Sequence, residues 1–89
     1  MKNLKVSEEV LSSKIDEEVV LMSIEAGYYF TLDPIGSRIW ELLSEKPYTL
    51  EGLVQVLMEE YEVDEVTCRA DVQAFIDEMS EKKLILSED

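Results

Sequence analysis

The residue types that most often carry catalysis are sparse in this sequence. It has no histidine, so the commonest general base and the commonest metal ligand are both missing. Its one nominal nucleophile motif is the Ser-x-x-Lys of Ser80 to Lys83. This motif falls at the expected end of a helix, where nothing would exclude water from Lys83. We therefore expect no catalysis there.

The single cysteine and the abundant carboxylates also favour structural roles. Cys68 lies on an apolar helical face without a histidine to activate it, as a small core residue would. The acidic residues form no Asp/Asn ladder of the calcium-binding kind, and the scattered glycines form no phosphate loop. Trp40 sits at a core position of an amphipathic pattern. We expect no enzymatic activity, no metal and no cofactor.

Size and charge limit the possible partners. The chain has 89 residues, 46% of them hydrophobic, and residues 1–89 are expected to form one domain. The 21 acidic and eight basic residues give a net charge of −13, which disfavours nucleic acid and anionic membranes. The lone cysteine, and the lack of a signal peptide or membrane span, predict a cytoplasmic protein. Its partner is then expected to be another polypeptide or a small cation-bearing molecule.

The elements are organised around GYYFTLDPIGSRIWELL, residues 27–43, which reads as a strand running directly into a helix. Aromatic and β-branched residues favour the strand. Asp33 can cap the helix, and Pro34 suits its first position. Further strands are expected at 10–15 and 19–24, giving with 28–32 an antiparallel meander. Its first turn, Asp16 to Glu18, is expected to be longer than two residues, and Gly27 supplies positive φ in the second.

The flanking segments complete an α+β fold, an N-terminal three-stranded antiparallel sheet followed by three helices, like a winged helix-turn-helix. Residues 1–9 are expected to be a loose arm with Leu4 and Val6 packed on the body. The first helix spans 34–45 and stops before Pro47. The second follows Thr49 as N-cap, and the third follows Asp64. Residues 84–86 close the chain in extended form. The apolar face of the third helix comprises Cys68, Val72, Phe75, Ile76 and Met79.

The two edges of the predicted meander differ. The first strand carries Lys14 and two serines, whereas the third has no charged residue from Gly27 to Leu32. A free, uncharged edge invites another strand. With the third helix beside it, this edge would bound a groove that fits an extended peptide. Phe30, Leu32 and Phe75 are expected to belong mainly to the core, while Tyr28, Tyr29 and Met79 are expected to be available to a ligand.

Several of these motifs resemble the PqqD-like family, the recognition elements for precursors of ribosomally made, modified peptides. The similarity rests on VVLMSIEAGYYFTLDPIGSRIWELL, on the acidic EEYEVDE turn and on RADVQAFIDEMSEKKLI, and it covers about residues 10–85. The sequence looks most like the stand-alone members from lasso-peptide clusters. One departure is the first turn, where the family commonly has glycine.

The resemblance implies that the leader segment of a precursor peptide adds as a strand beside the third helix. It also implies a separate cysteine-protease leader peptidase and a cyclase as further partners. Arg69 could meet a leader carboxylate, although contact with Gln73 or Glu65 is the simpler assumption. Carried over by position, the peptide-binding residues are Tyr28, Tyr29, Phe30, Thr31, Leu32, Arg69, Val72, Gln73, Phe75, Ile76 and Met79.

Two other functions remain open at this stage. The first is a peptide chaperone for a radical SAM enzyme, as in the biosynthesis of the cofactor PQQ. The second is a winged-helix DNA-binding regulator, although the acidic residues around Arg69 oppose it.

Overall fold

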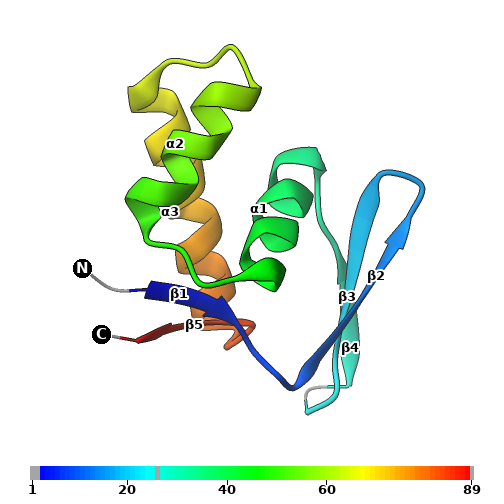
Figure 1. The fold of residues 1–89 in the computed structure, drawn as a ribbon. Helices are drawn as coiled ribbons and strands as arrows, with labels where there is room; N and C mark the ends of the chain where they lie inside the picture. Colours follow the sequence, from blue (N-terminus) through cyan, green and yellow to red (C-terminus); the bar gives the residue numbers. More distant parts are fainter. Residues whose placement is uncertain (1–2, 26, 89) are drawn as a thin grey trace.

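The computed structural model describes residues 3–25 and 27–88, which form five strands and three helices (Figure 1). The first four strands precede the helices, and the fifth strand follows them. In chain order the elements are β1 (Asn3–Val6), β2 (Val10–Ile15), β3 (Glu18–Ser23), β4 (Tyr28–Thr31), α1 (Pro34–Glu45), α2 (Leu50–Glu60), α3 (Glu65–Glu81) and β5 (Ile85–Glu88).

The predicted meander is confirmed as the antiparallel sheet β2-β3-β4. Its first turn is tighter than expected, because Ile15 pairs with Glu18 and only Asp16 and Glu17 lie between them. Asp16 adopts the left-handed region, with φ of 58°, which aspartate tolerates better than most residues. A two-residue hairpin therefore forms without glycine. In the second turn Gly27 has φ of +76°, as predicted.

The N-terminal segment is not the loose arm that we expected. β1 pairs antiparallel with β5, the last strand of the chain, in a second sheet. The backbones of Leu4 and Tyr48 exchange hydrogen bonds of 2.6 and 3.1 Å, and Leu4 is buried. Four residues of mixed pattern could not reveal this strand, because the partner that orders it lies about eighty residues away in the sequence.

The three helices begin where their caps predict. Side-chain oxygens of Asp33, Thr49 and Asp64 accept hydrogen bonds from backbone N–H groups three residues later, at 2.7, 3.1 and 2.8 Å. Each bond satisfies one of the donors left free at a helix start. The α1 helix ends at Glu45, two residues before Pro47, as expected.

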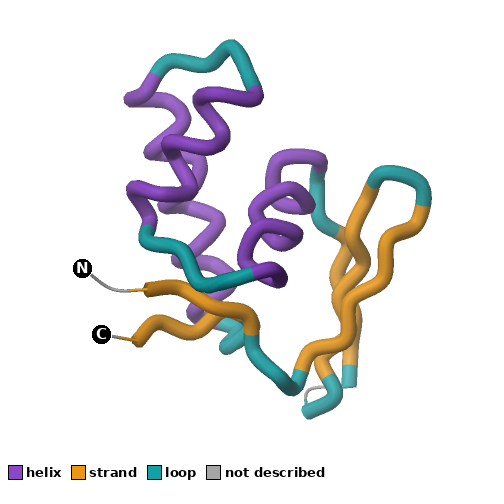
Figure 2. The backbone as a smooth tube through the Cα atoms, in the orientation of Figure 1, coloured by secondary structure: helices purple, strands orange, loops and turns teal. Residues whose placement is uncertain are grey.

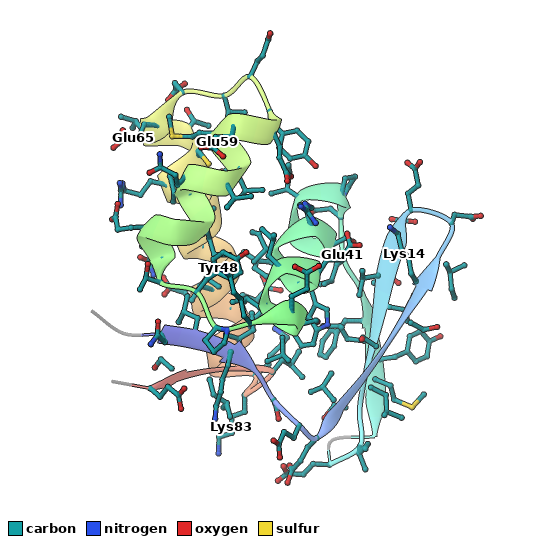
Figure 3. The ribbon with its side chains drawn as sticks, in the orientation of Figure 1. Lys14, Glu41, Tyr48, Glu59, Glu65 and Lys83 are labelled. Carbon is teal, nitrogen blue, oxygen red and sulfur yellow. The ribbon has the colours of Figure 1, made fainter. Side chains whose placement is uncertain are left out.

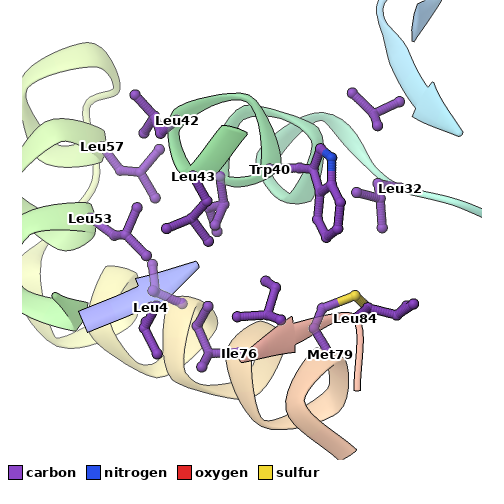
Figure 4. Packing of buried hydrophobic residues seen from close by; sticks show 14 of the residues in the cluster. Leu4, Leu32, Trp40, Leu42, Leu43, Leu53, Leu57, Ile76, Met79 and Leu84 are labelled. Atoms are coloured by element: carbon purple, nitrogen blue, oxygen red, sulfur yellow. The ribbon is translucent and has the colours of Figure 1, made fainter. Parts of the chain in front are cut away.

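The α1 helix lies between the meander and the pair formed by α2 and α3 (Figure 2). It contributes Ile39, Trp40, Leu42 and Leu43 to the core, which the other helices and both sheets complete (Figure 4). The hydroxyl of Ser37 joins α1 to the meander, since it accepts from Val19 N–H at 2.9 Å and donates to the carbonyl of Leu32 at 3.2 Å. This buried contact fixes how the meander sits on the helices.

Candidate peptide-binding edge

β4 is an edge of the meander, and its register shows which of its backbone groups are free. The N–H of Leu32 bonds to the carbonyl of Val19 at 2.9 Å, and Phe30 lies opposite Leu21. Hydrogen-bonded pairs alternate along an antiparallel ladder, so Phe30 and Leu32 face β3 with their backbone groups. The N–H and C=O groups of Tyr29 and Thr31 therefore point away from the sheet, toward its open side.

The side chains of β4 alternate between the two faces of the sheet. Leu32 is buried toward the helices, and Phe30 on the same face is partly buried. Tyr29 has the opposite orientation and is 69% exposed on the outer face, opposite Met22 of β3. Thr31 is exposed as well. Tyr29 and Thr31 thus offer their main chains at the edge, whereas the side chain of Phe30 faces α3. The side chain of Tyr28 lies outside the described part of the structure.

Three of the six predicted binding residues on α3 belong to the core. Val72, Ile76 and Met79 are no more than 5% exposed. Met79 was expected to be available to a ligand and is instead packed inside, because it lies on the same side of α3 as the other two residues. Phe75 is partly buried and packs against the start of α1.

One contact joins α3 to the start of α1, and a second joins the end of α3 to β4. Near the end of β4, the ring of Phe75 packs so closely on Gly36 that a Cβ there would lie 2.8 Å from Phe75 Cε1. Toward the end of α3, the Lys82 ammonium lies 5.6 Å from the centre of the Phe30 ring. We call this surface, with the free main chain of Tyr29 and Thr31 and the side chains of Phe30, Phe75 and Lys82, the β4 edge site.

Lys82 was not among the predicted peptide-binding residues. The signal that could have placed it is its spacing, since residues 75, 79 and 82 recur at four and three positions along one face of a helix. Gly36 was likewise not predicted to contribute to the site. Its role becomes visible once the Phe75 ring is in place.

Two predicted members of the site are engaged elsewhere. Arg69 binds both oxygens of Glu51 on α2, one of them at 2.8 Å, and Glu65 at 3.2 Å. These hydrogen bonds lower the pKa of the Glu51 carboxyl. The simpler expectation of a bridge from Arg69 to Glu65 is confirmed. Gln73 donates to Asp77 at 2.8 Å and does not bond to Arg69.

The candidate chemical groups are placed as follows. The Ser80 to Lys83 segment is exposed at the end of α3. Cys68 is buried, its Sγ lies 3.9 Å from the carbonyl oxygen of Val54, and burial raises the pKa of its thiol. No group of three or more metal-ligating side chains occurs among the described residues. None of the helices described is both long enough and apolar enough to span a membrane.

Comparison with known proteins gives a family and two similar structures. Residues 18–85 match the family described as "Coenzyme PQQ synthesis protein D (PqqD)". A solved structure, "TbiB1 in Complex with the TbiA(beta) Leader Peptide", is 42% identical and has a TM-score of 0.85, with 91% of this chain and 93% of that chain covered. Another, "Lasso peptide synthetase B1 complexed with the leader peptide", is 23% identical with a TM-score of 0.81, covering 93% and 96%. No curated protein matches the sequence.

Proposed function

Because the chain belongs to the PqqD family, we propose that it binds the leader segment of a ribosomally made precursor peptide as an added strand on β4. The observation that carries the proposal is the free main chain of Tyr29 and Thr31, which offers two donors and two acceptors beside α3. The 42%-identical relative whose structure is described as a leader-peptide complex supports the same kind of ligand.

The β4 edge site predicts the character of the bound segment. A strand added to β4 continues the pleat, so its side chains alternate between the outer face and the face toward α3. Those that face α3 meet Phe30 and Phe75 and should be apolar. The Lys82 ammonium lies over Phe30 at the end of this row and favours a leader carboxylate nearby. The main-chain bonds would provide much of the affinity, and the inward side chains the selectivity.

We further propose that the precursor is a lasso peptide, and that this protein presents it without catalysis to a separate cysteine-protease leader peptidase and to a cyclase. One of the two similar structures is described as a lasso peptide synthetase, which favours a lasso-peptide pathway. The second candidate is a peptide chaperone for a radical SAM enzyme of PQQ biosynthesis, which the family description favours. Both candidates use the same β4 edge site and differ in the precursor that it recognises.

The test is fluorescence anisotropy of a labelled leader peptide, taken from the precursor gene adjacent to this one. We expect saturable binding by the wild-type protein. Tyr29→Pro removes an edge N–H and should weaken binding at least tenfold, which corresponds to about 1.4 kcal/mol. Phe75→Ala removes apolar surface and should weaken it by about tenfold as well.

A matched variant separates the contribution of the Tyr29 main chain to leader binding from that of its side chain. Tyr29→Ala keeps the edge N–H and removes only an outward ring, so it should bind within about threefold of wild type, roughly 0.6 kcal/mol. Circular dichroism must first show that all three variants are folded. If the wild-type protein does not bind the leader of the adjacent precursor, the proposal is wrong. If the folded Tyr29→Pro variant binds as wild type does, strand addition at β4 is wrong.

A further inference from the structure

The opposite edge of the meander also borders a hollow. An open cavity of about 270 Å³ lies between β2 and α1. Its walls include Ser12 and Lys14 from the strand, and Trp40, Glu41 and Glu45 from the helix. β3 lies between β2 and β4, so this cavity and the β4 edge site are on different edges of one sheet. The two sites therefore do not overlap.

The wall of this cavity contains an unsatisfied donor. Trp40 is only 2% exposed, and its indole Nε1 has no hydrogen-bond acceptor. Among the described residues it is the one buried side-chain nitrogen or oxygen in this state. Figure 4 shows the nitrogen on the side of the ring away from Met79 and Leu84. Buried polar groups are nearly always hydrogen-bonded, so this N–H calls for an acceptor that the described chain does not supply.

The main chain of β2 supplies further free groups beside it. The N–H of Ile24 bonds to the carbonyl of Glu9 at 3.2 Å, and Ser12 lies opposite Leu21. By the same alternation as on β4, the backbone groups of Ser12 and Lys14 point away from β3. An extended segment lying along β2 could pair with them and would pass over the cavity.

The charges of the cavity indicate which segment fits. Lys14 bonds to Glu41 at 3.3 Å, and the two side chains face each other across the space between β2 and α1 (Figure 3). Glu45, one turn farther along α1, makes no ion pair among the residues described. Glu45 therefore adds to the cavity a carboxylate without a salt bridge, on a chain of net charge −13, and Arg38 acts on it only at longer range. Lysine or arginine on the incoming segment would complement it.

We propose that the cavity between β2 and α1 is a second polypeptide-binding site, which takes an extended, basic segment of a partner protein. The segment pairs with the main chain of Ser12 and Lys14. A cationic side chain of the segment lies beside Glu45, and an acceptor oxygen reaches Trp40 Nε1 after the side chains that cover this nitrogen move aside. This site does not depend on leader binding at β4.

The experiment uses the chain's only tryptophan, so a ¹H–¹⁵N spectrum contains one indole N–H signal. The probes are the peptides acetyl-KQKQKQ-amide, with acceptors and cations, and acetyl-EQEQEQ-amide. The lysine peptide should shift the indole signal downfield as it gains an acceptor, together with the amides of Ser12 and Lys14. The glutamate peptide should leave all three in place. An indole signal that millimolar lysine peptide does not move would overturn the proposal.

Variants distinguish this site from general attraction to an acidic protein. Glu45→Gln should weaken binding of the lysine peptide at least threefold, whereas Glu59→Gln on α2 should leave its binding unchanged. Ser12→Pro removes an edge donor and should abolish the indole shift. Tyr29→Pro, on the other edge, should retain it. The proposal would also be contradicted if Glu59→Gln reduced the indole shift as much as Glu45→Gln does. An indole shift that persists in folded Ser12→Pro protein would contradict it as well.

Discussion

At the scale of single residues, the β4 edge site depends on a glycine. Gly36 is the third residue of α1, and the Phe75 ring occupies the space that any other side chain would need. An added Cβ would lie 2.8 Å from Phe75 Cε1 and 3.1 Å from the capping oxygen of Asp33. The glycine is required by close packing and not by its backbone conformation. It therefore fixes where the Phe75 ring lies in the β4 edge site.

We predict that Gly36→Ala lowers the free energy of unfolding by about 1–3 kcal/mol, because the Phe75 ring must move. This is the net change, after the gain of about 1 kcal/mol that replacing glycine with alanine normally brings to a helix. Urea denaturation measures it.

Gly52→Ala on α2 is the matched control, since its nearest contact is a Tyr48 side-chain atom at 3.3 Å. That variant should be neutral or stabilising. Truncation of the ring, in Gly36→Ala/Phe75→Ala, should remove the clash, so that Gly36→Ala no longer destabilises the Phe75→Ala protein. If Gly36→Ala and Gly52→Ala change the free energy of unfolding equally, Gly36 does not have this packing role.

At the scale of elements, a bidentate ion pair joins α1 to α2. Arg38 donates to Glu60 from Nε at 2.8 Å and from Nη2 at 2.6 Å. These bonds lower the pKa of the Glu60 carboxyl below its ordinary value and raise the pKa of Arg38. Both side chains are about one third exposed, so solvent weakens the pair.

The direction of the pH dependence follows from the lowered pKa. The unfolded chain binds a proton at Glu60 more readily than the folded chain, so acid favours unfolding. The contribution of the pair is complete above the ordinary carboxyl pKa of 4.5 and is lost as pH falls through the lower folded value. We predict that Glu60→Gln destabilises the protein at pH 7 and reduces the loss of stability on acidification.

Chemical denaturation at a series of pH values measures this effect. Glu59→Gln is the control, because Glu59 is exposed on the same helix and makes no ion pair in the described structure. A Glu60→Gln protein with the same acid dependence as Glu59→Gln would show that the pair contributes nothing to the linkage.

At the scale of the whole molecule, the β1–β5 pair joins segments from the two ends of the described chain (Figure 1). Leu4 anchors it, since this residue is 6% exposed and bonds through its backbone to Tyr48 between α1 and α2. The β1 strand thus contacts the helical core as well as β5. The meander does not depend on this pair for its own hydrogen bonds.

Leu4→Ala should lower the free energy of unfolding by about 2–5 kcal/mol, the usual cost of truncating a buried leucine. Lys5→Ala is the control, because its bridge to Glu88 at 3.3 Å is about half exposed and should contribute about 0–1 kcal/mol. Urea denaturation compares the two. If both substitutions cost the same small amount, residues 3–6 behave as the loose arm that the sequence indicated.

The sequence by itself determined the elements whose signals are local. The caps at Asp33, Thr49 and Asp64 and the stop before Pro47 predicted the helices closely. The meander followed from short apolar and aromatic runs with connections too short for any other pairing. The same short connections placed the first and third strands of the meander at its edges. These predictions succeeded because backbone preferences, capping and turn length act over a few neighbouring residues.

Only the tertiary structure decided which of these residues meet one another. β1 is a strand because β5 lies beside it, and Asp16 closes a tight turn because β2 and β3 pair on both sides of it. The orientation of α3 about its axis buries Met79 and places Lys82 over Phe30. It also lets Arg69 bond to Glu51 on α2. Helical spacing shows that residues share a face but not which element covers it. That choice is made when the whole core packs.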